Sequence, residues 1–351
     1  MTVAIITDQH FGARNDSRHF LEFYEKFYTN SFFPSLDASG ISNLLILGDT
    51  FDRRKYVNFS SLQAAKQMFF DKLAERNIKV NMLVGNHDIY YKNTNEVNSP
   101  ELLLQDYSNI NIISTPQTIE VEGTLICMIP WICPDNYEAS MAEIKNTRAE
   151  ICMGHLEIGG FQMYRGMESH GGLSSKIFEK FEVVFSGHYH HKSSKENITY
   201  LGTPYELTWQ DYADQKGFHY FDLGTRKLQF EANPYSMYCR IEYDDKDKEP
   251  IDLNSIRLDE KYIKLVVVNK TDYYKFDIFV NTLYTKGCHD IKIVEDFSDF
   301  ENSEIGSDVD LEDTLSILST YIDSTNTDLD KEKIKNYMKT LYTEAVNSEV
   351  V

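Results

Sequence analysis

The sequence predicts an α/β fold, a layered arrangement of sheet and covering helices, for residues 1–232. Short apolar runs alternate there with segments whose apolar residues recur at helical spacing, which is typical of layered α/β domains. Several of the apolar runs are followed directly by Asp, Asn or His. Ligands of open α/β sheets bind outside the carboxyl ends of the strands, so this pattern also predicts a polar site at that edge.

Local signals place the elements of this region. Ser39 and Gly40 close the first expected helix, and Ser60 can cap the second. The expected helices are residues 17–36, residues 60–76, a short segment after Pro100 and residues 136–146. The expected strands are residues 3–7, 44–47, 80–84, 110–113, 119–121, 124–129, 151–153, 183–185, 198–201, 218–222 and 227–230.

A second region, residues 233–297, predicts a small α+β module. Its apolar segments favour one helix, which Gly287 would end, and three strands. The helix is expected at residues 273–286 and the strands at residues 240–243, 262–268 and 291–294. We find no catalytic constellation in this module.

The last part of the chain predicts a linker and a helical hairpin. Seven acidic and no basic residues lie between Ser298 and Asp313, so we expect an acidic linker at residues 298–310. Residues 311–351 then carry two amphipathic helical faces separated by a polar turn. The first face contains Leu311, Leu315, Leu318 and Ile322, and the second contains Ile334, Tyr337, Met338, Leu341 and Ala345.

Composition limits the classes of function. The 351 residues include 55 acidic and 35 basic side chains, a formal net charge of −20. This balance argues against binding of nucleic acid through bulk charge, but not against a nucleic-acid enzyme whose metals or partner supply positive charge. Five cysteines without a Cys-x-x-Cys pair, no signal peptide and no apolar run of ~18 residues predict a cytoplasmic protein with reduced thiols and no membrane span.

The polar residues at the strand ends have the chemistry of a two-metal site. They are Asp8-Gln9-His10, Gly48-Asp49-Thr50-Phe51-Asp52, Gly85-Asn86-His87-Asp88, Gly154-His155 and Gly187-His188-Tyr189-His190. Carboxylate, amide and imidazole groups suit two ions such as Mn²⁺, ~3.5–4 Å apart, that clamp the oxygens of a phosphoester. Asp49 is the natural bridge because it follows a central strand. Asp8, His10 and a distal His can complete one site, and Asn86 with two other His the second.

In this order the five segments resemble the metal-binding pattern of the calcineurin-like metallophosphoesterases. Further stretches resemble the SbcD-type DNA repair nucleases of that family, among them the recombination endonuclease subunits of T-even phages. These stretches are Ile129-Pro130-Trp131, Gly154-His155-Leu156-Glu157, Gly166-Met167-Glu168-Ser169-His170-Gly171 and Tyr200-Leu201-Gly202-Thr203-Pro204. The resemblance covers residues 1 to about 231 and implies a layered β-sandwich flanked by helices. Beyond it, a capping domain and a helical tail match the subfamily in order and length.

The resemblance implies a role for each site residue. One Mn²⁺, with Mg²⁺ as the alternative ion, would be bound by Asp8, His10, Asp49 and His190. The second would be bound by Asp49, Asn86, His155 and His188. His87 would be the general acid that protonates the leaving oxygen.

Three assignments stay open at this point. Some related nucleases have His where this chain has Asp52, and we expect Asp52 to hold another active-site side chain by hydrogen bonding instead of binding metal. His170 lies in a Gly-rich loop that resembles the ligand loop of Ser/Thr phosphatases and is an alternative to His155. We favour His155 because it follows its strand directly. Arg53 and Arg54 form either a solvated turn or a contact with DNA phosphates.

The function implied by the resemblance is that of a Mn²⁺-dependent DNA nuclease subunit. It would act as a 3′–5′ exonuclease on duplex ends and as an endonuclease on single strands, with an SMC-like coiled-coil ATPase, in recombination and double-strand-break processing. Residues 311–351 would dock on the ATPase, and the capping domain would contact DNA and transmit the ATPase state to the nuclease site. A homodimer in the bacterial cytosol, phage-encoded or bacterial, is also implied.

Two rival functions deserve comparison. One is another metallophosphoesterase, such as a cyclic-nucleotide phosphodiesterase or a protein phosphatase, but an enzyme for small molecules has no need of a detached helical hairpin. The other is a scaffold that holds an ATPase dimer together. A scaffold requires neither the full set of metal ligands nor His87.

Overall fold

The computed structural model describes residues 1–164, 166–169, 171–246 and 251–294, and beyond them residues 322, 331, 333–335 and 338. The chain divides into two compact units, Met1–Val294 and Glu295–Val351. The expected linker at residues 298–310 lies outside the described residues, and so does most of the expected hairpin at residues 311–351. The described positions of that hairpin are helical. The expected domain boundary at residue 232 falls inside the first unit and stays a prediction.

The first sheet carries four of the strands that the apolar runs predict near the amino terminus. Its order is β14-β13-β1-β2-β3-β4. The four parallel strands are β1 (Thr2–Ile6), β2 (Asn43–Ile46), β3 (Lys79–Leu83) and β4 (Ile110–Ile113). The two antiparallel strands are β13 (Gly217–Asp222) and β14 (Leu228–Ala232).

The second sheet has the order β11-β12-β10-β7-β6-β5. Its parallel strands are β6 (Thr124–Ile129), β7 (Ile151–His155), β10 (Val183–Gly187) and β12 (Ile198–Tyr200). Its edges are the antiparallel strands β5 (Gln117–Val121) and β11 (Ser193–Lys195). The strand ends that predict the site are therefore divided between two sheets.

The two sheets pack face to face through a layer of aliphatic and aromatic side chains. Ile5 and Leu45 of the first sheet are fully buried together with Met128 and Met153 of the second. Phe185 meets Phe221 across this layer, with ring centroids 4.8 Å apart. The expected sandwich flanked by helices is thereby confirmed, and the interior layer fixes how the two sets of strand ends face each other.

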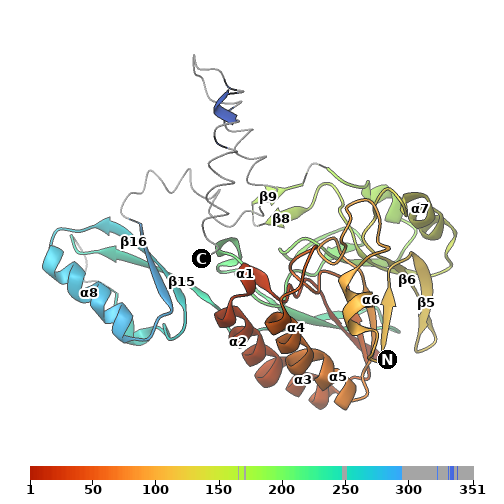
Figure 1. Cartoon of the computed structure of the whole chain (residues 1–351), viewed down its shortest axis with the longest axis horizontal. Helices are drawn as coiled ribbons and strands as arrows, with labels where there is room; N and C mark the ends of the chain where they lie inside the picture. The colour runs from red at the N-terminus through yellow and green to blue at the C-terminus, as the bar shows by residue number, and fades with distance from the viewer. Residues whose placement is uncertain are drawn as a thin grey trace. The chain divides into compact units, whose positions relative to one another are not determined.

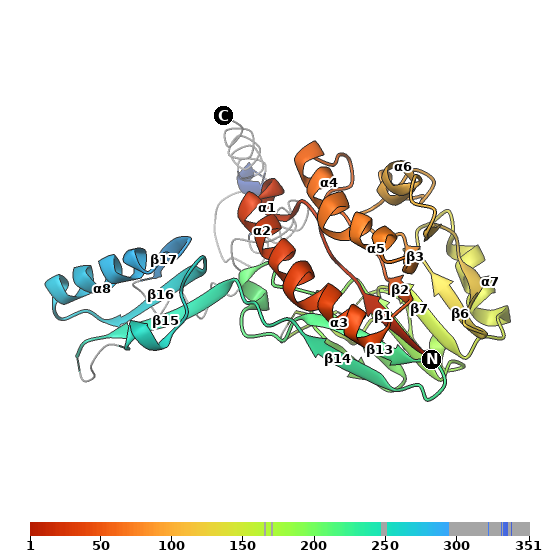
Figure 2. The same cartoon turned by 90° about the horizontal axis from the view of Figure 1, so that it is seen from below.

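Helices cover the outer faces of both sheets (Figures 1 and 2). The first expected helix is continuous and consists of α2 (Arg18–Phe27), a π-helical turn (Tyr28–Phe32) and α3 (Phe33–Ser39). The second consists of α4 (Phe59–Ala65), a π-helical turn (Lys66–Phe70) and α5 (Asp71–Glu75). Phe27, Tyr28 and Phe69 bury their rings between these helices and the first sheet. The other α-helices described before residue 233 are α1 (Ala13–Asp16), α6 (Ser99–Leu104) and α7 (Tyr137–Asn146).

Some local features differ from the sequence expectations. Gly40 ends the first helix with a left-handed φ of 62°, as expected. The second helix is capped by Asn58 and not by Ser60, because the Asn58 side chain accepts the Ser60 amide proton at 2.9 Å. A short hairpin of β8 (Gln162–Tyr164) and β9 (Met167–Glu168) follows β7 and has no counterpart among the expected strands.

The module after residue 233 is a parallel sheet of β15 (Tyr238–Asp244), β16 (Tyr262–Asn269) and β17 (Asp290–Val294). Helix α8 (Tyr273–Thr285) connects β16 to β17 and packs along the sheet (Figure 1). Tyr243, Phe276 and Phe279 form the centre of its core. The strands and helix expected here are confirmed, with β15 starting earlier than expected. In the part of the chain that the structure describes, no helix is long and apolar enough to cross a membrane.

The Asn58 cap gives a direct stability test. Asn58→Ala should lower the free energy of unfolding by ~0.5–2 kcal/mol, because it removes the side chain that accepts the Ser60 amide proton in the first turn of the helix. Ser60→Ala is the matched control, since its hydroxyl bonds Asn58 Oδ1 and caps no backbone group. Urea unfolding of both variants measures the difference, and a larger loss for Ser60→Ala would contradict the assignment.

Candidate metal centre

The candidate site lies where β1, β2 and β3 of the first sheet and β7 and β10 of the second reach their carboxyl ends. The loops there bend sharply, and Asp8, His10, Asp49 and His188 have φ values of 52°, 46°, 51° and 84°. A left-handed conformation costs a non-glycine residue ~1–2 kcal/mol and concentrates at functional sites. Four of the expected ligands are thus held in strained turns that aim their side chains at one point.

Asp49 occupies the middle of the site. Its Oδ2 lies 3.7 Å from His10 Nε2 and 3.4 Å from His155 Nε2, and its Oδ1 accepts the His87 amide proton at 2.8 Å. Two glycines make room for it. A Cβ at Gly85 would lie 2.2 Å from Asp49 Oδ1, and a Cβ at Gly48 would lie 2.5 Å from His155 Nδ1. The Gly-Asp and Gly-Asn pairs of the sequence are therefore steric requirements of this centre.

Among the described residues, three groups of possible ligand atoms surround Asp49, and the atoms within each group lie within 4.8 Å of one another; His10, Asp49 and His87 form one of them. Of the other two, the first contains Asp8, His10 and His190, with the two imidazole Nε2 atoms 3.2 Å apart. The second contains Asp49, His155 and His188. Asn86 joins the second group because its Oδ1 lies 2.8 Å from His155 Nε2 and 2.9 Å from His188 Nδ1. The structure thus brings all the expected ligands together around Asp49, and it also places His87, expected as the general acid, in a group with His10 and Asp49.

Backbone and carboxylate partners orient the histidines. His155 Nδ1 donates to the Leu47 carbonyl at 2.7 Å, which leaves Nε2 for a metal. His10 Nδ1 faces Asp52 Oδ1 at 3.3 Å, which likewise directs Nε2 toward the centre. His87 Nδ1 donates to the Asp52 carbonyl at 2.5 Å, so its Nε2 is directed away from that contact. Asp52 therefore lies beside two histidines, with its side chain facing His10 and its backbone carbonyl accepting from His87, and its expected supporting role stays a prediction.

The charges of the buried carboxylates and of the neighbouring histidines shift one another's pKa values. Burial opposes ionisation of Asp49, but the neighbouring His155 and His87 hold the pKa of Asp49 well below its usual range. Burial lowers the pKa of His188 and of His190. Burial also acts against the charged form of His155, yet Asp49 and Asp8 raise its pKa to about 9.

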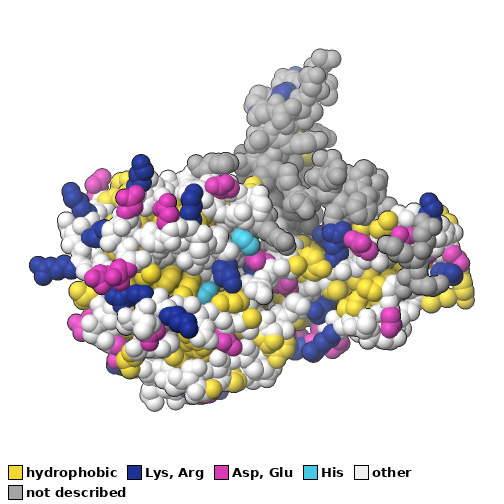
Figure 3. Space-filling model, turned by 180° about the vertical axis from the view of Figure 1, so that it is seen from behind, with side chains coloured by type: hydrophobic (Ala, Val, Ile, Leu, Met, Phe, Trp, Pro, Cys, Tyr) yellow, Lys and Arg dark blue, Asp and Glu magenta, His cyan; other side chains and the backbone are white. Residues whose placement is uncertain are grey.

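One side of the centre is open. Asp8, His10, Asp49 and His155 are buried, whereas His87, His188 and His190 are partly exposed. Figure 3 shows histidine side chains at the molecular surface, with hydrophobic, Lys or Arg, and Asp or Glu side chains near them. The ring of Trp131 lies 5.0 Å from that of His188 and closes one flank. A substrate would reach the centre past the three partly exposed histidines.

The two arginines expected near the substrate are engaged with the protein. Arg53 Nη1 pairs with Asp16 Oδ2 at 3.2 Å, and its guanidinium lies over the Tyr56 ring. Arg54 Nε donates to the Asn86 carbonyl at 2.8 Å and so braces a ligand loop. His170 lies outside the described residues, and the alternative that it replaces His155 stays untested.

Asp88 is a supporting residue to which the sequence analysis assigns no role. Its buried carboxylate accepts the amide protons of Thr50 and Phe51 through Oδ1 and that of Gly85 through Oδ2. Burial raises its pKa to about 6. It thereby joins the loop after β2 to the loop after β3. An Asp directly after the Asn86-His87 pair is the only signal in the sequence, and it does not reveal which amides the carboxylate meets.

Donor chemistry fits two divalent cations. Oxygen and imidazole donors converge without a thiolate, the set that suits Mn²⁺ or a similar ion and not a structural zinc site. Burial of most donors would make an unpaired carboxylate costly, and a cation satisfies it. Asp49 contacts both groups, as a bridging ligand must.

Known proteins are similar in sequence to this chain over most of its length. The family model of the calcineurin-like phosphoesterases matches residues 1–192. The chain is 32% identical over 309 residues, 88% of both chains, to exonuclease subunit 1 of Enterobacteria phage T4. It is 26% identical over 283 residues, 76% of this chain and 74% of the other, to the DNA double-strand break repair protein Mre11 of Methanocaldococcus jannaschii. A solved archaeal phosphodiesterase covers 66% of this chain and 99% of its own with 9% identity and a TM-score of 0.35, a level that supports no conclusion.

The bridge can be tested by one nearly isosteric change. Asp49→Asn removes the charge that two cations would share, so we expect loss of metal-dependent phosphodiesterase activity by at least two orders of magnitude, with folding intact. Circular dichroism checks the fold, and metal titration counts bound ions. Normal activity with Mn²⁺ would exclude Asp49 as the bridge.

Variants of the adjacent residues Asn86 and His87 distinguish metal binding from catalysis. Asn86→Ala should weaken metal binding because it removes the oxygen between His155 and His188. His87→Ala should leave both metals bound and slow the reaction ~10²–10⁴-fold, the usual contribution of a general acid. Calorimetric metal titration alongside cleavage rates distinguishes the two, and loss of a metal from His87→Ala would reverse the assignment.

Proposed function

Because this chain belongs to the calcineurin-like phosphoesterase family, we propose that it is the nuclease subunit of a DNA recombination and repair complex. The observation that carries the proposal is the two-group centre around Asp49, inside a chain whose two named relatives are an exonuclease subunit and a double-strand-break repair protein. Both relatives align over far more than the catalytic region, which supports a shared use of the whole chain.

In this proposal, the first group and Asp49 hold one Mn²⁺, and Asp49 with the second group and Asn86 holds the other. The ions, when bound, polarise a phosphodiester and lower the pKa of a bound water. The residues of the protein supply the orientation of the histidines and the proton for the leaving oxygen. Asp52 keeps His10 and His87 in orientation, and His87 Nε2 carries the proton that the leaving oxygen needs.

We further propose that the substrate is DNA, cut 3′ to 5′ from duplex ends and endonucleolytically in single strands. The open side of the centre, at His87, His188 and His190, would receive the phosphate. Arg53 and Arg54 lie in the loop that carries Asp52, so a strand crossing the centre would pass them.

An SMC-like ATPase and a second copy of this chain are the proposed partners in a bacterial cytosol. With a net charge of −20, the chain gains from a partner that supplies DNA-binding surface. For self-association we propose the helices after β2 and β3, where Phe59 of α4 is 87% exposed and Leu102 of α6 is 63% exposed. Large exposed apolar side chains on neighbouring helices favour a protein contact.

End-labelled DNA tests the proposed activity. The pure chain should cut single-stranded DNA in Mn²⁺, and addition of the ATPase with ATP should enable processing of duplex ends. The same assay with Mg²⁺ in place of Mn²⁺ tests which ion supports cleavage. Faster hydrolysis of a cyclic nucleotide or a phosphopeptide than of DNA would instead indicate another phosphoesterase of the family.

Removal of residues 309–351 tests the proposed docking segment. No expected metal ligand lies there, so the truncated chain should fold, bind two metals and cut single-stranded DNA. Association with the ATPase should be lost, because several large apolar side chains, each worth ~1.5–3 kcal/mol when buried, would leave the interface. A pull-down decides between the outcomes. A complex that survives the truncation would move the docking site to another surface.

A further inference from the structure

A short stretch after β12 contacts two of the ligand loops. We call residues 202–207 the bracing segment. Its Tyr205 is buried, and the Tyr205 hydroxyl donates to the Gln9 carbonyl at 2.6 Å. Gln9 lies between Asp8 and His10, so this bond fixes the backbone from which both side chains extend.

The same segment holds the loop after β10. The Thr203 amide donates to the His190 carbonyl at 3.3 Å, and Lys216 Nζ donates to the same oxygen at 2.8 Å. The fit is close, because a Cβ at Gly202, where φ is +72°, would lie 3.1 Å from that oxygen. The bracing segment therefore positions the backbone of every ligand in the first metal group.

Its other contacts lead to the module expected at residues 233–297, which we call the capping module and of which the structure describes residues 233–246 and 251–294. The buried Glu206 carboxylate accepts the amide protons of Met237 and of Tyr238, the latter at 3.0 Å. The Tyr238 hydroxyl donates to the Leu207 carbonyl at 3.2 Å. Tyr238 is the first residue of β15, so Glu206 anchors the point where the chain enters the module.

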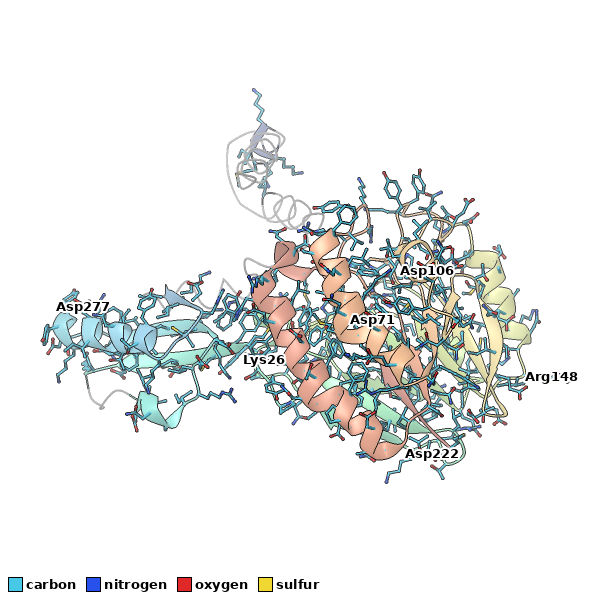
Figure 4. All side chains as sticks on the ribbon, turned by 60° about the horizontal axis from the view of Figure 1, so that its bottom comes forward. Lys26, Asp71, Asp106, Arg148, Asp222 and Asp277 are labelled. Carbon is cyan, nitrogen blue, oxygen red and sulfur yellow. The ribbon has the colours of Figure 1, made fainter. Side chains whose placement is uncertain are left out.

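A second path runs from the module through α2. His19 stacks on His289 with ring centroids 3.7 Å apart, and Lys26 pairs with Glu260. Figure 4 shows Lys26 on the flank of α2 that faces the module. The same helix carries Tyr24, whose ring stacks on Tyr205 at 3.7 Å. Both paths from the capping module end at Tyr205.

We propose that Tyr205 and Glu206 are positioning residues that couple the placement of the capping module to the geometry of the first metal group. Movement of the module would displace Glu206 and α2. That displacement shifts the Tyr205 hydroxyl away from the Gln9 carbonyl, and Asp8 and His10 move with the Gln9 backbone. The link rests on the metal centre of the proposed function. Because coupling is reciprocal, metal binding must also steady the entry to β15.

The test uses the full chain and three variants. Tyr205→Phe removes only the hydroxyl, Glu206→Gln disturbs the anchor, and Tyr220→Phe is the matched control, a tyrosine whose hydroxyl bonds Ser35 Oγ. Calorimetry with Mn²⁺ measures metal affinity. Hydrogen exchange of residues 233–243, with and without Mn²⁺, measures protection of the entry to β15.

Loss of one hydrogen bond should weaken Mn²⁺ binding at one of the two sites roughly three- to tenfold in Tyr205→Phe. Mn²⁺ should slow exchange at Met237 and Tyr238 in the natural chain and in Tyr220→Phe, but not in Tyr205→Phe. Glu206→Gln should speed exchange at these amides and also weaken Mn²⁺ binding, with the Tyr205 hydroxyl still present.

The outcomes separate this proposal from the proposed function. A natural chain that binds no Mn²⁺ pair would overturn both. Two bound ions in the natural chain, with Tyr205→Phe behaving as Tyr220→Phe does, would overturn only the coupling. Faster exchange in Glu206→Gln with unchanged Mn²⁺ affinity would do the same, and this variant decides the matter if Tyr205→Phe does not fold.

Discussion

The placement of the Asp49 carboxylate, buried between two sheets, is the constraint on which the rest of the site depends. A buried carboxylate is costly unless it is paired and hydrogen-bonded. Here the pairing comes from His10 and His155, one from each sheet, and from the amide of His87. Gly48 and Gly85 leave the space that these contacts require. Any shift of one loop therefore exposes or crowds the same charge.

The packing of the two sheets sets the dimensions of the centre. Gly187, at the end of β10, shows how closely the two sheets approach each other. A Cβ at this position would lie 2.1 Å from Thr7 Oγ1 and 2.8 Å from the Leu47 carbonyl oxygen. The aliphatic layer between the sheets holds that approach over the length of the strands. Precision at the metal ligands is thus a property of the core as much as of the loops.

Local signals in the sequence predict most of this structure, and long-range contacts account for what they miss. Apolar runs place the strands, and Asp, Asn and His at their ends mark the candidate ligands, since those signals depend on neighbours in the chain. The same signals do not reveal that β7 and β10 belong to a second sheet. They do not show that Asp88 meets three amides, or that Tyr205 reaches Gln9, because the partners lie far away in sequence. Asn58 takes the cap expected of Ser60 because a side chain two residues earlier reaches the same helix start.

The charge of the chain limits how far the proposed centre can attract DNA. Two divalent cations would add four positive charges against the two ligand carboxylates Asp8 and Asp49, so the centre itself would favour phosphate. That attraction is screened within ~8 Å at physiological salt, and the chain around it carries a net charge of −20. Arg53 and Arg54 already have partners in Asp16 and the Asn86 carbonyl. In the proposed function, the centre would act on a DNA strand that a partner brings to it, which is why a DNA-binding partner belongs to that proposal.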